Sequence, residues 1–410
     1  MTKQKEMKNK KKQFKKASGI TLIALVITIV VLIILATVSI NMILNDDGII
    51  GSAEKSKELY QNAVSKEQVE LGIIESELED HLPKVDMVKS EDNQYVPVPK
   101  GYVASTIEGE KSVSTGFVIK KGDNGAATEG VNEFVWVPVS EESFNAMFAT
   151  STTGPIYLSG QSGEKGVKTE YYSNLRIRTG DSYTLTKPGT SGVREPDLLT
   201  DYDNDSYAVR AGYTNLSAMA QGLVNDYANM RESIKKYKGF YIGRYELTGS
   251  VENPTVQSGN VLDTDWYNLY KACRNVAKAG EEVTSTMIWG CQWDETMNWL
   301  KNTKFKDDPS LVDSNSSSWG NYSDYDNGIY ASPQITGYNK QGWSANNICD
   351  LAGNYFEWTQ EADYTDLRVC RGGYYDYTGS DIPASARYDG DSPDVNGSVY
   401  SARATLYVNP

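Results

Sequence analysis

Histidine is almost missing from this sequence, and cysteine is scarce. The single histidine, His81, stands between an acidic run and Leu82-Pro83, where we interpret it as a solvated residue at a helix end. Because this one imidazole is placed at a solvated helix end, His-based catalytic triads, His-rich zinc sites and most general-base mechanisms are not expected. The four cysteines have no Cys-x-x-Cys spacing; they are Cys273, Cys291, Cys349 and Cys370. Their apolar surroundings favour buried free thiols, although one or two disulfides of unknown pairing stay open.

The chain also lacks an overall excess of positive charge. Residues 1–19 carry eight Lys and one Glu, which gives +7, but the total of −14 leaves −21 for the remainder. Nucleic-acid binding depends on neutralising phosphates with Lys and Arg, so this balance excludes nucleic acid as a partner. Phe and Trp are few, at 8 each, whereas Tyr reaches 28. Because tyrosine is amphipathic, its excess indicates a contact surface more than a larger interior.

One long apolar run stands out near the N-terminus. Ile20 to Ile40 is 21 residues without a charge, which is enough for a helix to cross a bilayer. The basic residues ahead of it predict that the N-terminus lies inside and the rest outside. We therefore predict a basic leader at 1–19 and a transmembrane helix at 20–44. The alternative, a secretory signal peptide, is disfavoured because the run is too long and lacks a convincing cleavage site.

Local patterns divide the rest of the chain. Apolar residues spaced three and four apart predict an amphipathic stalk helix within 45–83, followed by a polar linker at 84–98. Short strand patterns and turns then predict one globular domain over 99–410. Residues 141–235 form a predicted insertion of loops with one helix near 218–235.

A triplet in this insertion has the spacing of a calcium loop. Asp201, Asp203 and Asp205 occupy its first, third and fifth positions, but Ser206 replaces the glycine expected next. A solvated acidic loop is therefore the preferred interpretation.

The leader and helix resemble the type IV prepilin family over roughly residues 1–80. The resemblance rests on a Lys-rich leader that ends in Gly19 and on Ile20-Thr21-Leu22-Ile23, which opens the apolar helix. It implies that a membrane prepilin peptidase cuts after Gly19 and that Ile20 is then methylated. The fifth mature position, usually a glutamate that sets filament register, is Ala24 here. This difference argues against assembly into a major filament.

Five ordered segments resemble the formylglycine-generating-enzyme (sulfatase-modifying factor) superfamily. They are FVWVPV, GFYIGRYELT, QWDETMNWL, DLAGNYFEWT and VCRGGYYD. The resemblance implies an α+β fold of the C-type lectin-like kind, preceded here by the long pilin-like transmembrane and amphipathic helix. In the fourth segment, Gly353 permits a backbone conformation that a side chain would forbid, while Phe356 and Trp358 are expected in the core.

The same resemblance bears on cofactors and on catalysis. It implies a structural Ca²⁺ site formed by Asp350, the carbonyls of Gly353 and Tyr355, and Glu357; alternatively, the two carboxylates only bond backbone in the turn. The copper-binding Cys pair of the family's oxidases has no counterpart at 374–383, and the histidines of its iron-dependent branch are missing too. Copper and iron are therefore not expected, and we predict that the chain is not an enzyme.

Residues 374–403 have an unusual composition. Their 30 residues include five Tyr, five Asp and five Ser but no Lys, Glu or Gln. A plain polar loop would use Lys and Glu as freely as Asp, whereas Tyr with Ser, Gly and Asn is typical of antibody paratopes. The segment also resembles the variable proteins of diversity-generating retroelements. The candidate varied, ligand-binding positions are Tyr374, Tyr375, Asp376, Tyr377, Tyr388, Asp389, Asp391, Asp394, Asn396, Ser398, Tyr400 and Ser401. The expected scaffold positions are Gly372, Gly373, Pro383, Ala384, Arg387 and Arg403.

Together these patterns predict a ligand-binding protein displayed on the cell surface and anchored through residues 20–44. An external protein or glycan is the expected partner. A minor structural subunit of a type IV pilus or pseudopilus is the alternative function, and a residual oxidase is a weaker one.

Overall fold

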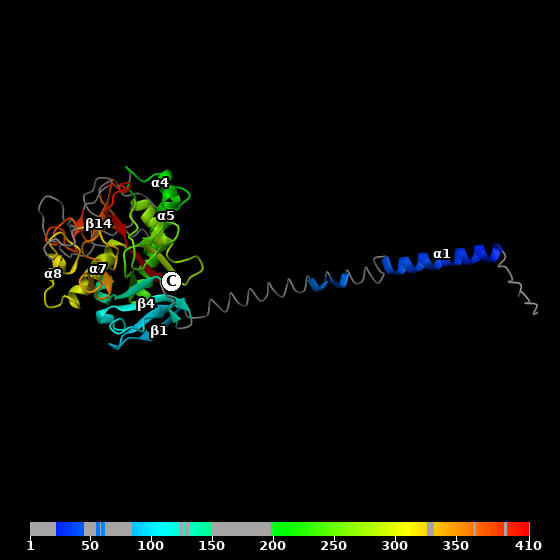
Figure 1. Cartoon of the computed structure of the whole chain (residues 1–410), viewed down its shortest axis with the longest axis horizontal. Coiled ribbons are helices and arrows are strands. Elements are labelled where there is room, and N and C mark those ends of the chain that lie inside the picture. Colours follow the sequence, from blue (N-terminus) through cyan, green and yellow to red (C-terminus); the bar gives the residue numbers. More distant parts are fainter. Residues whose placement is uncertain are drawn as a thin grey trace, which may run out of the picture. The chain divides into compact units, whose positions relative to one another are not determined.

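The computed structural model separates the chain into two compact units, residues 1–82 and 83–410. Each unit is described by itself (Figure 1). The described residues are 22–44, 55–57, 59–61, 84–123, 126–127, 131–148, 198–199, 201–325, 332–363, 366–388 and 392–409.

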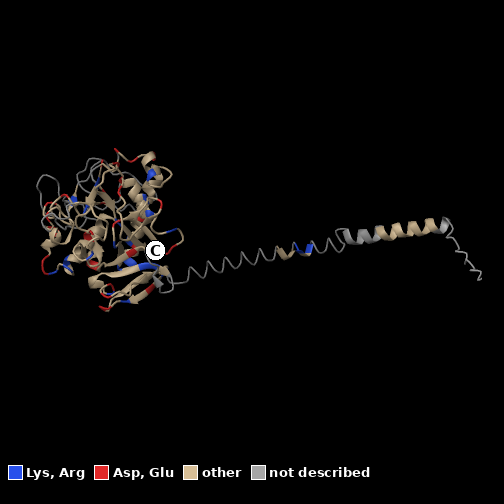
Figure 2. Ribbon diagram, in the orientation of Figure 1, with Lys and Arg blue, Asp and Glu red and all other residues tan. Residues whose placement is uncertain are grey.

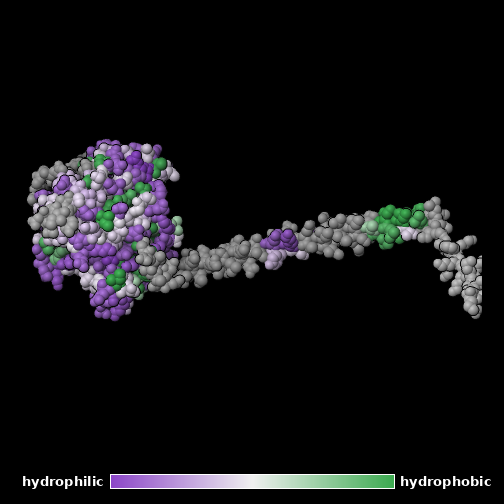
Figure 3. Space-filling view, viewed as in Figure 1, coloured by the Kyte–Doolittle hydropathy of each residue, from purple (hydrophilic) through white to green (hydrophobic). Residues whose placement is uncertain are grey.

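Helix α1 (Leu22–Leu44) is the main element of the first unit and lies within the segment 20–44 that was predicted to be a transmembrane helix. Its helical conformation agrees with the prediction, but the membrane-spanning part of the prediction is not supported. The side chains of residues 25–36 are exposed, and they form the apolar stretch seen in Figure 3. Among the helices that the structure describes, none combines the length and apolarity needed to cross a membrane. His81, the processing positions Gly19 and Ile20, and most of the predicted stalk lie outside the described residues.

A seven-stranded antiparallel sheet is the centre of the second unit. Its order is β10 (Val283–Met287), β17 (Ala404–Val408), β7 (Gly239–Gly243), β6 (Glu133–Pro138), β4 (Phe117–Asp123) and β3 (Tyr102–Ala104), with β5 (Ala126–Ala127) paired to β4. The chain's last strand thus lies between β10 and β7. Phe134 to Val137 in β6 are all buried, so this strand is covered on both faces.

A smaller four-stranded sheet holds the Tyr-rich segment. Its order is β15 (Arg387–Tyr388), β14 (Leu367–Arg371), β13 (Phe356–Asp363) and β16 (Tyr400–Ala402). Strands β13 and β16 run parallel, and the other pairs are antiparallel. Both of the expected core aromatics, Phe356 and Trp358, are buried on β13.

Residues 84–98, predicted to be a linker, instead form most of a hairpin. Strand β1 (Val85–Lys89) pairs with β2 (Tyr95–Pro99), and Val96 and Val98 are buried. The Asp92 carboxylate accepts backbone hydrogen bonds from Val113 at 3.0 Å and Ser114 at 2.9 Å, which ties the turn to the domain. Two further two-stranded pairs are β8 (Thr248–Gly249) with β9 (Pro254–Thr255), and β11 (Ser344–Ala345) with β12 (Ile348–Cys349).

Helices of very different length complete a mixed α+β domain. They are α3 (Glu141–Met147), α4 (Asp205–Arg210), α5 (Leu216–Tyr237), α6 (Trp266–Arg274), α7 (Gly290–Asn302), α8 (Ser310–Asp313) and the 3₁₀ turns Val113–Thr115 and Ser317–Trp319. Helix α5 confirms the one predicted in the insertion, whereas α3 and α4 were not predicted. All four cysteines are buried free thiols, as the prediction favoured.

Candidate ligand-binding surface

Three buried arginines bracket the Tyr-rich segment. Arg371 precedes a first loop, residues 372–386; Arg387 separates it from a second loop, residues 389–399; and Arg403 follows β16. Each guanidinium is at most 1% exposed and pairs with buried carboxylates. We call these three residues with Asp294, Glu361 and Glu357 the arginine frame.

The first two arginines share one pair of acids. Arg371 donates to Asp294 at 2.7 Å and to Glu361 at 3.2 Å, while Arg387 donates to Glu361 at 2.7 Å and also to Asp294. The Arg371 guanidinium also donates to the carbonyls of Ala386 at 2.9 Å and Ser385 at 3.1 Å. Two cations thus face two anions, and both ends of the first loop are fixed to β13 and α7.

Arg403 fixes the end of the second loop in the same way. Its guanidinium donates to the Glu357 carboxylate, with Nε–Oε2 at 2.9 Å, and to the carbonyls of Gly243 and Cys349, each at 2.9 Å. Because Gly243 ends β7, this side chain connects the small sheet to the central one. The pairing holds the pKa of Arg403 above its usual value, despite a burial that acts to lower it.

Glycines make the close turns around this frame. Gly353, Gly372 and Gly373 have φ of +70°, +85° and +74°, the region that favours glycine. A Cβ on Gly353 would lie 2.1 Å from the Asn321 carbonyl oxygen, and one on Gly373 would lie 2.6 Å from that of Ile382. All six expected scaffold positions are buried, as that prediction requires.

Tyrosines from the first loop and from β15 gather near one buried ring, that of Phe356. Phe356 lies 4.7 Å from Tyr374 and 4.9 Å from Tyr388, centroid to centroid. Tyr377 lies 5.0 Å from Tyr374, and Tyr375 meets Tyr374 edge-on at 5.2 Å. These four half-buried residues, Tyr374, Tyr375, Tyr377 and Tyr388, are the tyrosine cluster. Burial, followed by the charge of Asp376, raises the pKa of Tyr374, so its hydroxyl stays protonated at neutral pH.

The remaining predicted contact positions differ in exposure. Asp376, Asn396 and Ser398 are exposed, and Asp394 is half-buried. Tyr400 and Ser401 are instead buried in β16, where Tyr400 stacks on Trp358 at 4.9 Å. These two residues support the surface from below and do not form its face. Asp389 and Asp391 lie outside the described residues.

The insertion touches the second loop directly. The Tyr202 hydroxyl donates to Ser392 Oγ at 2.8 Å, and the Tyr207 hydroxyl donates to Asp394 Oδ2 at 3.0 Å. Tyr207 stacks on Tyr267 of α6 at 4.5 Å. Helix α4 therefore lies beside the second loop, as the green and red segments of Figure 1 show.

Asp203 corrects the prediction of a solvated acidic loop. It is 7% exposed, and its carboxylate accepts bonds from Arg368 at 3.1 Å, Tyr267 at 2.7 Å and the Leu199 amide at 2.6 Å. This buried aspartate holds the insertion against β14. Asp205 accepts the Leu216 amide at the start of α5, so two of the three aspartates serve the local structure, whereas Asp201 is exposed.

The calcium set is not assembled as the resemblance implied. Both oxygens of Glu357 are engaged by Arg403, and Asp350 Oδ2 accepts from Thr336 at 2.9 Å and from the Gly337 amide at 2.7 Å. Within the described ranges, no group of three or more His, Cys, Asp or Glu side chains is placed to hold a metal ion. Gly353 and Tyr355 lie in the same turn, but Glu357 does not fit the ligand role.

A second buried acid, Glu246, adjoins this turn. Its Oε2 accepts from Asn354 Nδ2 at 2.8 Å, and the Asn354 carbonyl accepts the Tyr375 amide at 3.2 Å. Burial, then the charges of Asp350 and Glu357, raises the pKa of Glu246 well above its ordinary value. Burial likewise raises the pKa of Asp350 to about 6. Asn354 thereby links a protonatable acid to the base of the tyrosine cluster.

Sequence reasoning missed several residues whose hydrogen bonds hold the two loops in place. They are Arg371, Asp294, Glu361, Asn354, Tyr202 and Tyr207. The first two and Asn354 belong to segments that resembled the superfamily, so a signal was present. Nothing local marks the two insertion tyrosines, because their partners are almost 190 positions away.

In the ribbon of Figure 2, Lys and Arg positions are interspersed with Asp and Glu positions over the globular unit.

No protein-family model matches the sequence, and no curated protein is similar to it. Among solved structures, the chain is similar to "Treponema denticola variable protein 1", with 13% identity over 80% of this chain and 100% of that one. The TM-score is 0.24, and at these values the likeness does not establish what this chain binds.

Proposed function

We propose that this chain is a binding protein whose contact surface consists of the tyrosine cluster and the exposed polar residues of both loops. The observation that carries the proposal is the combination of a buried arginine frame with half-buried tyrosines above it. The frame fixes both loops before a ligand arrives, so little ordering entropy opposes binding. Tyrosine adds rigid contact area with a polar edge.

The surface chemistry indicates the kind of ligand. Asp376 and Asp381 are exposed beside the cluster, and the described part of the two loops carries no Lys. An external protein with basic or hydroxyl-rich groups, or a glycan, complements such a surface. We propose binding and not catalysis, because the Cys and His ligands of the resembled oxidases are missing from the sequence.

Diversification of this surface by a retroelement is part of the proposal. The frame bonds involve carboxylates and main-chain carbonyls, so they do not depend on the displayed side chains. Sequencing the neighbouring DNA tests the point. A near-copy of the coding segment for 374–401 that differs at adenines, beside a reverse transcriptase, is the expected finding; its absence contradicts diversification but leaves binding intact.

The N-terminal part is proposed to anchor this domain at the cell surface. The uncharged run from Ile20 to Ile40 in the sequence and the basic leader ahead of it support a pilin-like membrane anchor that prepilin peptidase processes. Mass analysis of a surface fraction is expected to find Ile20 methylated at the new N-terminus. An intact leader would defeat the prepilin part of the proposal.

Binding is tested with the full chain, purified in mild detergent, on protein and glycan arrays. At least one reproducible ligand is expected, and Tyr375→Ala is expected to weaken it about tenfold or more, as loss of a central aromatic does. Tyr95→Ala is the matched control, because Tyr95 is an exposed tyrosine that lies on the β1–β2 hairpin, outside both loops.

Two outcomes would contradict the proposal. If no ligand binds reproducibly, the minor pilus subunit becomes the better function. If a ligand binds equally to Tyr375→Ala and wild type, the contact surface lies elsewhere.

A further inference from the structure

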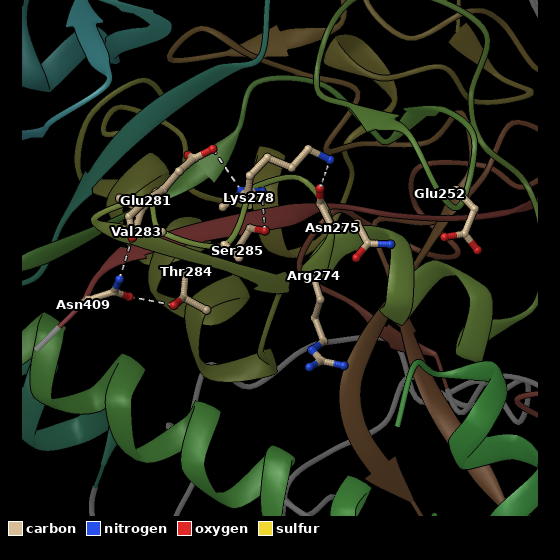
Figure 4. A pocket seen from close by; sticks show the side chains of 12 residues that line it. Glu252, Arg274, Asn275, Lys278, Glu281, Val283, Thr284, Ser285 and Asn409 are labelled. Carbon is tan, nitrogen blue, oxygen red and sulfur yellow. Dashed lines mark hydrogen bonds between the residues drawn. The ribbon is translucent and has the colours of Figure 1, made fainter. Parts of the chain in front are cut away.

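Two pockets lie away from both loops, and they differ in chemistry. The pocket in Figure 4 has a volume of about 480 Å³ and is lined by Arg274, Lys278, Glu252 and Glu281, among others. Its polar groups already bond one another or nearby residues. The pairs are Glu281–Lys121, Glu252–Lys271, Lys278–Asn275 and Thr284–Asn409. Arg274 also packs over the Tyr213 ring at 4.2 Å, so this pocket has little to offer a ligand.

The second pocket, of about 460 Å³, opens between β2, the end of β6, the start of α3, the end of α5 and α7. That volume lies within the range of small-molecule sites, roughly 300–1,000 Å³. Four of its lining residues are aromatic: Tyr95, Trp136, Tyr237 and Trp299. Its polar lining includes the side-chain amides of Gln94, Asn298 and Asn302 and the carboxyl of Glu295. We call it the α7 pocket.

A chain of hydrogen bonds along α7 orders its polar side. Asn302 Nδ2 donates to the Asn298 carbonyl at 2.9 Å, and Asn298 Nδ2 donates to Glu295 Oε2 at 3.3 Å. Glu295 itself is 3% exposed. Burial raises its pKa to about 7, so near neutral pH the carboxyl both donates and accepts hydrogen bonds.

Aromatic side chains line the same cavity. Tyr95 is 63% exposed at the rim, while Trp136 and Trp299 are 4% and 6% exposed in the wall. The lining contains one basic residue, Lys238 at the end of α5, and one acidic residue, Glu295. The pocket therefore carries little net charge, which disfavours phosphates and other multiply charged ligands.

We propose that the α7 pocket binds a neutral saccharide. A pyranose ring has an apolar C–H face that packs on an aromatic ring, and its edge of hydroxyls needs paired donors and acceptors. Aromatic rings, amides and a carboxyl all line this one cavity. None of the lining residues belongs to the loops at 372–399, so this site is separate from the contact surface proposed above.

The test uses saturation-transfer NMR on the full chain with neutral mono- and disaccharides that contain glucose, galactose, mannose or N-acetylglucosamine. At least one sugar is expected to bind with a dissociation constant on the order of 1 mM or tighter. Tyr95→Ala and Asn302→Ala change exposed residues outside the core, and each is expected to weaken binding about tenfold. Glu295→Gln keeps the size and the hydrogen-bonding groups, and it is expected to retain binding.

Tyr375→Ala is the matched control and is expected to bind the sugar as wild type does. Failure of the saccharide proposal can therefore be distinguished from failure of the proposed function. The saccharide test uses Tyr375→Ala as its control, and the contact-surface test uses Tyr95→Ala. The saccharide proposal is overturned if no sugar binds at about 10 mM. It is equally overturned if binding is unchanged in both Tyr95→Ala and Asn302→Ala, or is lost only in Tyr375→Ala.

Discussion

Replacing Arg387 by methionine tests whether the arginine frame holds the two loops. Arg387 is 1% exposed; its Nε donates to Glu361 at 2.7 Å, and its Nη2 bonds Asp294. Methionine fills much of the volume but leaves Arg371 as the one cation facing two buried carboxylates. Removing one partner of such a network typically costs about 3–5 kcal/mol of unfolding free energy, because a buried charge is left uncompensated.

Urea unfolding of the full chain, followed by tryptophan fluorescence, measures this loss. Lys100→Met is the matched control. The Lys100–Asp86 pair has side chains 48% and 64% exposed, so its loss is expected to cost about 0–1 kcal/mol. The double variant Arg387→Met/Glu361→Gln restores one cation to one anion and is expected to recover about 1–3 kcal/mol.

Either of two results would refute the reasoning. If Arg387→Met unfolds within about 1 kcal/mol of wild type, the ion pairs do not hold the loops. If the double variant is less stable than the single one, the charge imbalance is not the cause of the loss. Ligand binding by Arg387→Met should weaken along with stability, since both loops end at this residue.

Four further outcomes follow from other parts of the domain. Because the pKa of Asp350 is raised to about 6 in the folded state, the folded protein binds one more proton than the unfolded chain between pH of about 4 and 6. The contribution of Asp350 to the free energy of unfolding is therefore complete below that window and falls by about 3 kcal/mol as pH rises through it. Asp350→Asn should flatten this pH dependence in urea melts. Gly373→Ala should lower the free energy of unfolding by about 1–3 kcal/mol more than Gly109→Ala does. Gly109 has a similar φ of +83°, but a Cβ there would have nothing within 4 Å, so equal losses would contradict the predicted clash at Gly373. Tyr207→Phe removes the hydroxyl from Asp394, and hydrogen exchange at 392–395 should accelerate while global stability changes by about 1 kcal/mol or less; unchanged exchange would mean that the insertion does not hold the loop. Iodoacetamide should leave all four buried thiols unmodified until urea unfolds the protein, since burial also raises the pKa of Cys349 to about 12; rapid labelling of the native chain would contradict this.

Local sequence patterns predicted the elements whose causes are local. The strands β4, β6 and β7 lie within the region of short strand patterns predicted over 99–410, and α5 covers the helix predicted near 218–235. The hairpin at 85–99 was missed because its polar appearance hides alternating valines that are buried only against the rest of the domain. Short helices such as α4 rely on one cap, here Asn204, whose side chain accepts from Ser206 at 2.9 Å.

The candidate binding surface, too, was predictable from the sequence only in part. Composition found the tyrosine cluster, and the glycine and arginine positions pointed to its scaffold. Composition does not show which acid meets which arginine. The Glu357–Arg403 pair spans 46 residues and the Arg387–Asp294 pair spans 93. For this reason Glu357 was assigned to calcium by resemblance, although Arg403 occupies its carboxylate.

Packing also decides which displayed positions can change. Replacing Tyr374, Asp376, Asn396 or Ser398 removes no bond of the arginine frame, because the frame uses main-chain carbonyls and buried carboxylates. Tyr400 is different: it is 5% exposed and stacks on Trp358 at 4.9 Å, so a small residue there would leave a cavity and cost about 3–5 kcal/mol. Ser401 is fully buried and pairs with Glu357 across β13 and β16. Diversification that keeps this fold should therefore concentrate on the exposed and half-buried positions and retain large apolar rings at 400.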